Sequence, residues 1–163
     1  MSTGYTWTVP SASGTIIPVG DRADQQARFW GRDLWLDTNV LAGRADVLTT
    51  PAADLRIATG RQALRQALIR RIITAPGDWA LLPNYGAGAR LYVKERNTQA
   101  NRDELAERIR AQLMLEPRVE SVISVVVSQL EDTQGISINV VVMPKGSARP
   151  EDNLQFVLEG RAA

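Results

Sequence analysis

The stretch LMLEPRVESVISVVVSQLEDTQGISINVVVM, residues 113–143, contains the change of periodicity that decides the fold class. Before Glu116 the apolar residues recur at helical spacing, and after Arg118 they form two runs rich in valine. The first run is Val119–Leu130, and the second, Ile136–Met143, alternates apolar and polar residues. EDTQG between the two runs is typical of a hairpin loop. We therefore expect a helix that stops at the proline and an antiparallel β-hairpin after it.

The first of two predicted helices lies in ATGRQALRQALIRRIITAPG, residues 58–77. Thr59 and Gln62 have the spacing of a capping box, in which a hydroxyl and an amide satisfy free backbone N–H groups. Pro76 and Gly77 stop the helix. The side of this helix that packs on the sheet is expected to consist of Leu64, Ala67, Leu68 and Ile72.

Arg71 falls within this apolar side of the helix. The favoured interpretation is that its aliphatic stem packs on the core while its guanidinium reaches water near the helix C-terminus. The alternative is that the guanidinium meets a buried carboxylate.

The second helix is predicted from about Arg102 to Leu115, with Asn101 as the N-cap and Glu104 three residues later. LQFVLEG, residues 154–160, is a candidate third strand.

Two main helices packed on a small antiparallel sheet make an α+β fold. Such a sheet has edges, and a free edge accepts a strand from another chain. The apolar side of the second helix is expected to consist of Leu105, Ile109 and Leu113.

The chain is expected to have three parts: an N-terminal extension or arm at residues 1–32, a main domain at 33–143 and a tail at 144–163. DRADQQARFWGRD in the extension forms a short helix or remains an arm. Trp30 and Trp35 complete the core of the domain in the favoured interpretation, and dock on a neighbouring protein in the alternative. DWALLPNYGAGARLYVKE, which follows the first helix, is expected to be a loop with short extended pieces.

Composition narrows the class of protein. The 163 residues are 44% hydrophobic, enough for one domain with a core, and no apolar run is long enough to span a bilayer. MSTGYTWTVP lacks the features of a secretory signal, so we expect a soluble protein used without export. A net charge of +1 gives no global field to attract nucleic acid. Arginine supplies 17 of the 19 basic residues, which indicates either an interaction surface or an arginine-rich genome.

The sequence contains few side chains suited to catalysis or metal binding, because histidine and cysteine are both absent. Their absence removes the commonest general base, the commonest metal ligands and any disulfide. GAG at residues 86–88 is not followed by the Gly-Lys-Ser/Thr of a phosphate loop, and neither lysine has a Ser-x-x-Lys spacing. We predict no catalytic residue, cofactor or metal. The remaining enzyme hypothesis, a cell-wall glycosidase using two of Asp78, Glu95 and Glu116, is disfavoured because almost any protein has two carboxylates.

In this order and spacing, the motifs resemble the small baseplate-wedge family of contractile phage tails. Related members occur in type VI secretion and other contractile injection systems. Two motifs carry most of the resemblance, ITAPGDWALLPNYG at Ile73–Gly86 and the triplet Glu116, Pro117 and Arg118. The resemblance covers roughly residues 33–143. Within the loop motif, the family residues are Thr74, Pro76, Gly77, Pro83, Tyr85 and Gly86.

The resemblance implies a structural protein of the tail baseplate, or of an equivalent injection-system baseplate, assembled in the bacterial cytoplasm. It implies a link between the wedge and the first sheath ring that nucleates sheath assembly. The implied partners are the contractile sheath protein and the helical core of the wedge; an alternative partner is the tube or spike hub. Neither nucleic acid nor a membrane is implied.

The implied fold resembles the strand-accepting domain of sheath proteins, which offers a sheet edge to the extended arms of sheath subunits. In this chain that edge is expected at Ile136–Met143 or at the strand beside it. The N-terminal extension and the tail either cover an edge or grip neighbouring proteins. The residues of the candidate sheath-accepting strand are Ile136, Ile138, Val140 and Val142.

Within the triplet, Glu116 lies at a helix C-terminus, where its negative charge is unfavourable. It becomes favourable if Glu116 and Arg118 form a fixed, charge-assisted set with each other or with a partner. Pro117 restricts the backbone between them. We expect the pair to organise the wedge contact, as the resemblance implies. The alternative is a local surface salt bridge worth less than about 1 kcal/mol.

Overall fold

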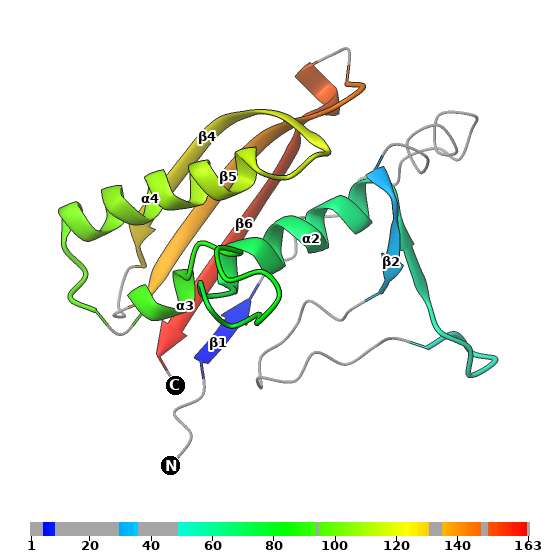
Figure 1. The fold of residues 1–163 in the computed structure, drawn as a ribbon, viewed down its shortest axis with the longest axis horizontal. Helices are drawn as coiled ribbons and strands as arrows, with labels where there is room; N and C mark the ends of the chain where they lie inside the picture. Colours follow the sequence, from blue (N-terminus) through cyan, green and yellow to red (C-terminus); the bar gives the residue numbers. More distant parts are fainter. Residues whose placement is uncertain are drawn as a thin grey trace.

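The computed structural model describes residues 5–8, 30–35, 49–93, 95–130, 135–147 and 150–162. Figure 1 shows two long helices lying across one four-stranded sheet, with a two-stranded ribbon beside them. The predicted α+β class is confirmed. In chain order the elements are β1 (Tyr5–Thr8), β2 (Arg32–Leu34), β3 (Ile57–Thr59), α2 (Arg61–Ile73), α3 (Ala89–Tyr92), α4 (Gln99–Met114), β4 (Val119–Gln129), β5 (Ile136–Pro144), η1 (Pro150–Asp152) and β6 (Leu154–Ala162).

The four-stranded sheet is antiparallel throughout and has the order β1-β6-β5-β4. β4 and β5 form the predicted hairpin, with Val125 opposite Val140 and Gln129 opposite Ile136. Its EDTQ residues, 131–134, lie outside the described residues. The stretch LQFVLEG forms most of β6, which pairs with the other side of β5. β1, which the sequence did not indicate, extends the sheet beyond β6.

One face of the sheet forms the core with α2 and α4. β5 alternates strictly between buried and half-buried residues, as its apolar-polar alternation predicted. The predicted apolar sides of both helices are buried against this face. The residues that fill the core from the two helices are Leu64, Ala67, Leu68, Ile72, Leu105, Ile109 and Leu113.

Both helices begin differently from the sequence prediction. The N-cap of α2 is Gly60, which has φ 56 and no side chain to cap the helix, and Thr59 is the last residue of β3. The Thr59–Gln62 capping box is therefore wrong. α4 is capped by Thr98, whose hydroxyl oxygen accepts a hydrogen bond from the Asn101 N–H at 3.2 Å. Asn101 thus lies inside the first turn of the helix rather than at its cap, and the predicted start is also wrong.

The segment between α2 and α4 was expected to contain short extended pieces, and this prediction is wrong. Its described residues form a series of turns followed by the short helix α3. Gly88, with φ 74, precedes α3 in the left-handed conformation that glycine adopts without strain.

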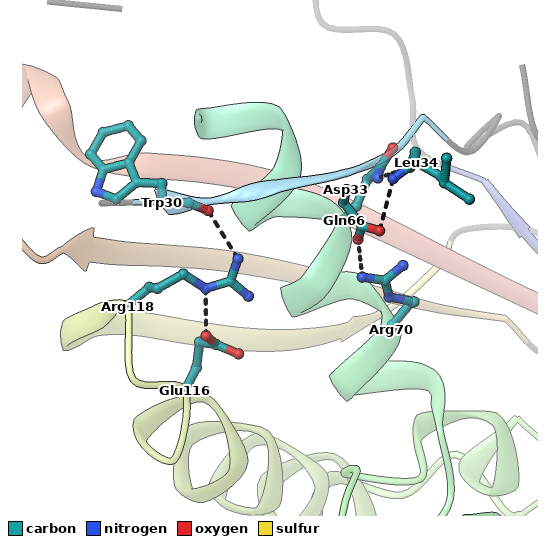
Figure 2. Close-up of polar contacts among 7 residues, drawn as sticks. All are labelled: Trp30, Asp33, Leu34, Gln66, Arg70, Glu116 and Arg118. Atoms are coloured by element: carbon teal, nitrogen blue, oxygen red, sulfur yellow. Dashed lines mark hydrogen bonds and ion pairs between the residues drawn. The ribbon is translucent and has the colours of Figure 1, made fainter. Parts of the chain in front are cut away.

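The β2–β3 ribbon is anchored to α2 at its base. Gln66 Nε2 donates a hydrogen bond to the Leu34 carbonyl at 3.0 Å, and Arg70 forms an ion pair with Asp33. Figure 2 shows both contacts. Trp35 continues the ribbon and stacks against Arg56, whose guanidinium carbon lies 4.3 Å from the ring centroid. A two-stranded ribbon has little stability of its own, so these contacts fix its position on the body.

The two tryptophans near the N-terminal extension have different environments. Trp30 is fully buried in the core, as the favoured interpretation predicted, whereas Trp35 is half-buried on the ribbon and does not belong to the core cluster. Most of DRADQQARFWGRD, residues 21–29, lies outside the described residues.

Candidate functional site

The triplet at the α4–β4 junction forms an internal charged network. The Glu116 side chain is only 8% exposed, and one of its carboxylate oxygens accepts a hydrogen bond from Arg118 Nε at 2.6 Å. Arg118 Nη1 also donates to the Trp30 carbonyl at 2.9 Å. Figure 2 shows Arg118 between Glu116 and Trp30. The predicted mutual pairing of Glu116 and Arg118 is present, and it joins the junction to the chain that precedes β2.

Arg71 brings α2 into the same network. Its side chain is only 12% exposed, and its guanidinium lies 3.6 Å from the second carboxylate oxygen of Glu116. On another side it lies over the Tyr85 ring, 4.4 Å from the centroid. The favoured interpretation, that this guanidinium reaches water, is therefore wrong. The end of α2 packs beside the end of α4, so the guanidinium meets the buried carboxylate of the alternative interpretation.

The pKa of Glu116 is set by two opposing effects, its burial and its two arginine neighbours. Burial alone raises the pKa of the carboxyl, because the charged form loses hydration. The hydrogen bond from Arg118 and the positive charges of Arg118 and Arg71 lower it by more, so the pKa lies below its ordinary value. Glu116 is consequently ionised at neutral pH inside the fold.

With the charged groups turned inward, the surface at the triplet is largely apolar. Leu115, at the C-terminal end of α4, is 63% exposed, and Met114 and Pro117 are exposed beside it. The pair was expected to form a fixed set, with each other or with a partner, and to organise the wedge contact. In the structure the two side chains pair with each other and fix the α4–β4 junction, while Leu115 and Pro117 face outward.

The loop motif between α2 and α3 is closed by backbone hydrogen bonds. Gly88 N–H donates to the Thr74 carbonyl at 2.8 Å, and Gly77 N–H donates to the Pro83 carbonyl at 2.8 Å. Gly86 has φ 104, and a Cβ placed on it would lie 2.1 Å from the Thr74 carbonyl oxygen. Only glycine fits there, which explains why the loop returns so close to the end of α2.

Gln112 on α4 holds the loop from its other side. Its Oε1 accepts a hydrogen bond from the Gly86 N–H at 3.1 Å, and its Nε2 donates to the Asn84 carbonyl at 3.0 Å. This role of Gln112 was not predicted from the sequence. A glutamine on the polar side of a helix carries no local signal for such a contact, because its partners are 26 and 28 residues away in the sequence.

The predicted sheath-accepting strand requires a correction. β5, which contains Ile136, Ile138, Val140 and Val142, pairs with β4 on one side and with β6 on the other. A strand paired on both sides has no free backbone groups to offer, so β5 is not an edge. The strand beside it, β4, is an edge of the sheet among the described residues. β1 lies at the opposite edge.

The backbone groups that β4 presents outward follow from its register. Leu130 N–H donates to the Gly135 carbonyl at 3.0 Å, so this opposing pair is hydrogen-bonded. Antiparallel pairs alternate, and Ser128 opposite Ser137 is therefore the next bonded pair along the strand. The N–H groups of Val125, Val127 and Gln129 consequently point away from β5, toward the outer edge.

The acidic residues considered for glycoside cleavage serve other roles or lie on the surface. Asp78 accepts hydrogen bonds from Arg90 Nη2 at 2.5 Å and from the Ala75 N–H at 3.0 Å. Glu116 is engaged with its two arginines, and Glu95 is exposed. Within the described ranges, no three metal-ligating side chains gather at one place. In the same part of the chain, no helix has both the length and the apolar character of a membrane span.

Comparisons with known proteins bear on the family. A chain of the anti-feeding prophage (AFP) baseplate, solved by cryo-EM with 6-fold symmetry, has a similar fold, with a TM-score of 0.52 and 18% identity. The likeness covers 64% of this chain and 84% of that one. A comparison with curated proteins finds no match.

The family model described as contractile injection system sheath initiator matches residues 32–144, most of the chain. This match confirms the resemblance to baseplate proteins that the sequence motifs indicated. The family is a structural one and not a class of enzymes. The chain therefore belongs to the sheath initiator family of contractile injection systems, and is a baseplate component on which sheath assembly begins.

Proposed function

We propose that the chain links the baseplate wedge to the first sheath ring through two separate surfaces. The first is the outer edge of β4, which accepts an extended arm of a sheath subunit as an added strand. Main-chain hydrogen bonds supply the affinity in this mode of binding. The observation that carries the proposal is that β4 is an edge strand beside a fully paired β5. The complex assembles in the bacterial cytoplasm.

The accepting segment is the regular part of β4. Two register shifts, at Val119/Ser121 and at Val122/Ser124, interrupt its first half. Bulges of this kind twist an edge and disfavour pairing there. From Ser124 to Gln129 the register is unbroken, so an arm pairs along this segment.

The second surface is the one that the triplet shapes, and it contacts the helical core of the wedge. The Glu116 network holds the end of α4 and the start of β4 in one relative position. This position exposes Leu115 and Pro117, which supply apolar contact area. Arg118, which is partly exposed, borders that area.

Sheath growth on purified baseplates that carry Gln129→Pro tests the first surface. Proline removes an outward N–H, and it is tolerated where that N–H is not part of the ladder. We expect normal incorporation into the baseplate and sheath nucleation slowed by about tenfold, the equivalent of one lost main-chain contact.

Ser128→Pro is the matched control, because the N–H of Ser128 points into the β4–β5 ladder. This change destabilises the chain itself, which thermal unfolding detects, and so separates damage to the fold from damage to the edge. Sheath growth at the wild-type rate on baseplates carrying Gln129→Pro would contradict the role of β4.

A further inference from the structure

The loop between α2 and α3 exposes three large apolar side chains at its tip. Leu81 is 92% exposed, Trp79 is 56% exposed and Leu82 is 51% exposed. Scattered apolar residues are normal on a surface, but three within four consecutive positions on one loop are a concentrated apolar area. We call these three residues the apolar plug.

The plug is held rigidly rather than carried on a flexible loop. Leu82 N–H donates to the Trp79 carbonyl at 3.0 Å, and Tyr85 N–H donates to the Leu82 carbonyl at 3.0 Å. The Trp79 and Tyr85 rings lie 5.9 Å apart. Backbone bonds around Gly86 and Gly88 then close the loop onto α2. A loop fixed in this way loses little conformational entropy on binding, which favours its use as a docking element.

The charges around the plug favour a protein partner over a membrane. Residues 79–89 contain no charged side chain. Asp78 and Arg90, which flank this stretch, pair with each other at 2.5 Å, and Arg71 near Tyr85 pairs with Glu116. Loops that enter anionic lipid surfaces combine apolar residues with cations available to the headgroups. Here the cations beside the plug are already paired.

The plug lies next to the end of α4. Gln112, which holds the loop at Asn84 and Gly86, is one helical turn before Leu115 and therefore on the same side of the helix. Leu115 is itself exposed and directly precedes the triplet.

We propose that Trp79, Leu81 and Leu82 form a docking plug that inserts into an apolar, uncharged socket on a neighbouring baseplate protein. The convex shape of a rigid loop requires a concave partner surface, and its lack of charge requires a socket without charge at its centre. The proposal rests on the baseplate function of the chain, but it is independent of the sheath contact at β4.

Incorporation of the chain into baseplates assembled without it tests the plug. Leu81→Asp places a charge at the most exposed position of the plug, where it does not disturb the fold, and Leu81→Met is the conservative variant. We expect Leu81→Asp to reduce incorporation by about tenfold or more, because a charge in an apolar socket is left unpaired. Leu81→Met should incorporate like wild type, and thermal unfolding of both variants should be unchanged.

Two results would overturn the proposal. One is equal incorporation of wild type and Leu81→Asp. The other is Leu81-dependent flotation of the chain with vesicles of phosphatidylcholine and phosphatidylglycerol, which would assign the plug to a membrane. Sheath growth is scored separately, on baseplates that already contain the chain. With Leu81→Asp, a defect confined to sheath growth would also overturn the proposal, whereas a loss of incorporation that Leu81→Met does not share supports it.

Discussion

At the scale of single residues, Glu116 explains how a carboxylate is tolerated at the C-terminal end of α4. Two arginines, one from α2 and one from the turn before β4, contact its two oxygens and outweigh both the helix dipole and the cost of burial. The contact with Arg71 joins residues 45 positions apart, so only the folded chain brings the pair together. Removing the carboxylate leaves two arginine charges close together without their shared partner.

Glu116→Gln should therefore lower the free energy of unfolding at pH 7 by about 2–3 kcal/mol, measured by denaturant titration. The folded pKa of Glu116 lies below the ordinary value of 4.5, so its stabilising effect is complete above pH 4.5. The effect is lost as the pH falls below that value through the folded pKa. The difference between wild type and variant should shrink in this acid range. A difference that is constant from pH 7 to pH 3 would contradict the account.

The tight return of the loop at Gly86 gives a second test at this scale. Gly86→Ala places a methyl group 2.1 Å from the Thr74 carbonyl oxygen, so the backbone must shift. Gly77→Ala is the matched control, because Gly77 also has a positive φ, 87, but no atom within 4 Å of its Cβ position. We expect Gly77→Ala to cost about 1 kcal/mol and Gly86→Ala at least about 2 kcal/mol more in thermal unfolding. Equal costs would show that the close approach at Gly86 has no energetic effect.

At the scale of elements, the start of α4 distinguishes the observed cap from the predicted one. Thr98→Ala removes the hydroxyl that accepts from Asn101 and should cost about 1 kcal/mol in the free energy of unfolding. Thr59→Ala serves as the control, because Thr59 lies in β3 and caps no helix. Its effect should stay below about 0.5 kcal/mol. If Thr59→Ala cost as much as Thr98→Ala, the assignment of the caps would be wrong.

The elements that could be predicted are those with a local periodic signal. The valine hairpin and the apolar sides of α2 and α4 follow from alternation and helical spacing within short windows of sequence. The helix starts could not be predicted, because Thr59, Thr98 and Asn101 are all residue types that cap helices. In the folded chain Thr59 pairs within β3, and Thr98 rather than Asn101 caps α4. β1 and the β2–β3 ribbon are only three or four residues long, too short for a period to register.

In the candidate site, too, the features with a local sequence signal could be predicted, and those that depend on distant residues could not. The triplet and the loop motif were visible as unusual local sequences, and the mutual pairing of Glu116 and Arg118 was expected. The roles of Arg71 and Gln112 depend on partners distant in the sequence, and the edge of the sheet depends on where β6 pairs. β6 pairs with the side of β5 that the hairpin leaves free. Among the described residues, β4 and not β5 is therefore the edge strand of the hairpin.

At the scale of the whole molecule, the fold separates its internal bonds from its candidate contacts. The charged network and the core bind α2, α4 and the sheet into one unit. Among the described residues, β4 leaves a backbone edge open on that unit, while the plug and Leu115 present apolar side chains. The proposed link between a wedge and a sheath requires such separate surfaces, since each partner must bind without displacing the other.

If a sheath arm completes the sheet at β4, as proposed, its main-chain hydrogen bonds protect the outward amides of β4 from hydrogen exchange. The amides of Val125 and Val127 should exchange at least about tenfold more slowly once sheath subunits are added to baseplates that carry the chain, because they gain main-chain partners. The Ser128 amide, which already points into the β4–β5 ladder, should be protected in both states. Sheath rings that form while the exchange of Val125 and Val127 stays unchanged would contradict the account.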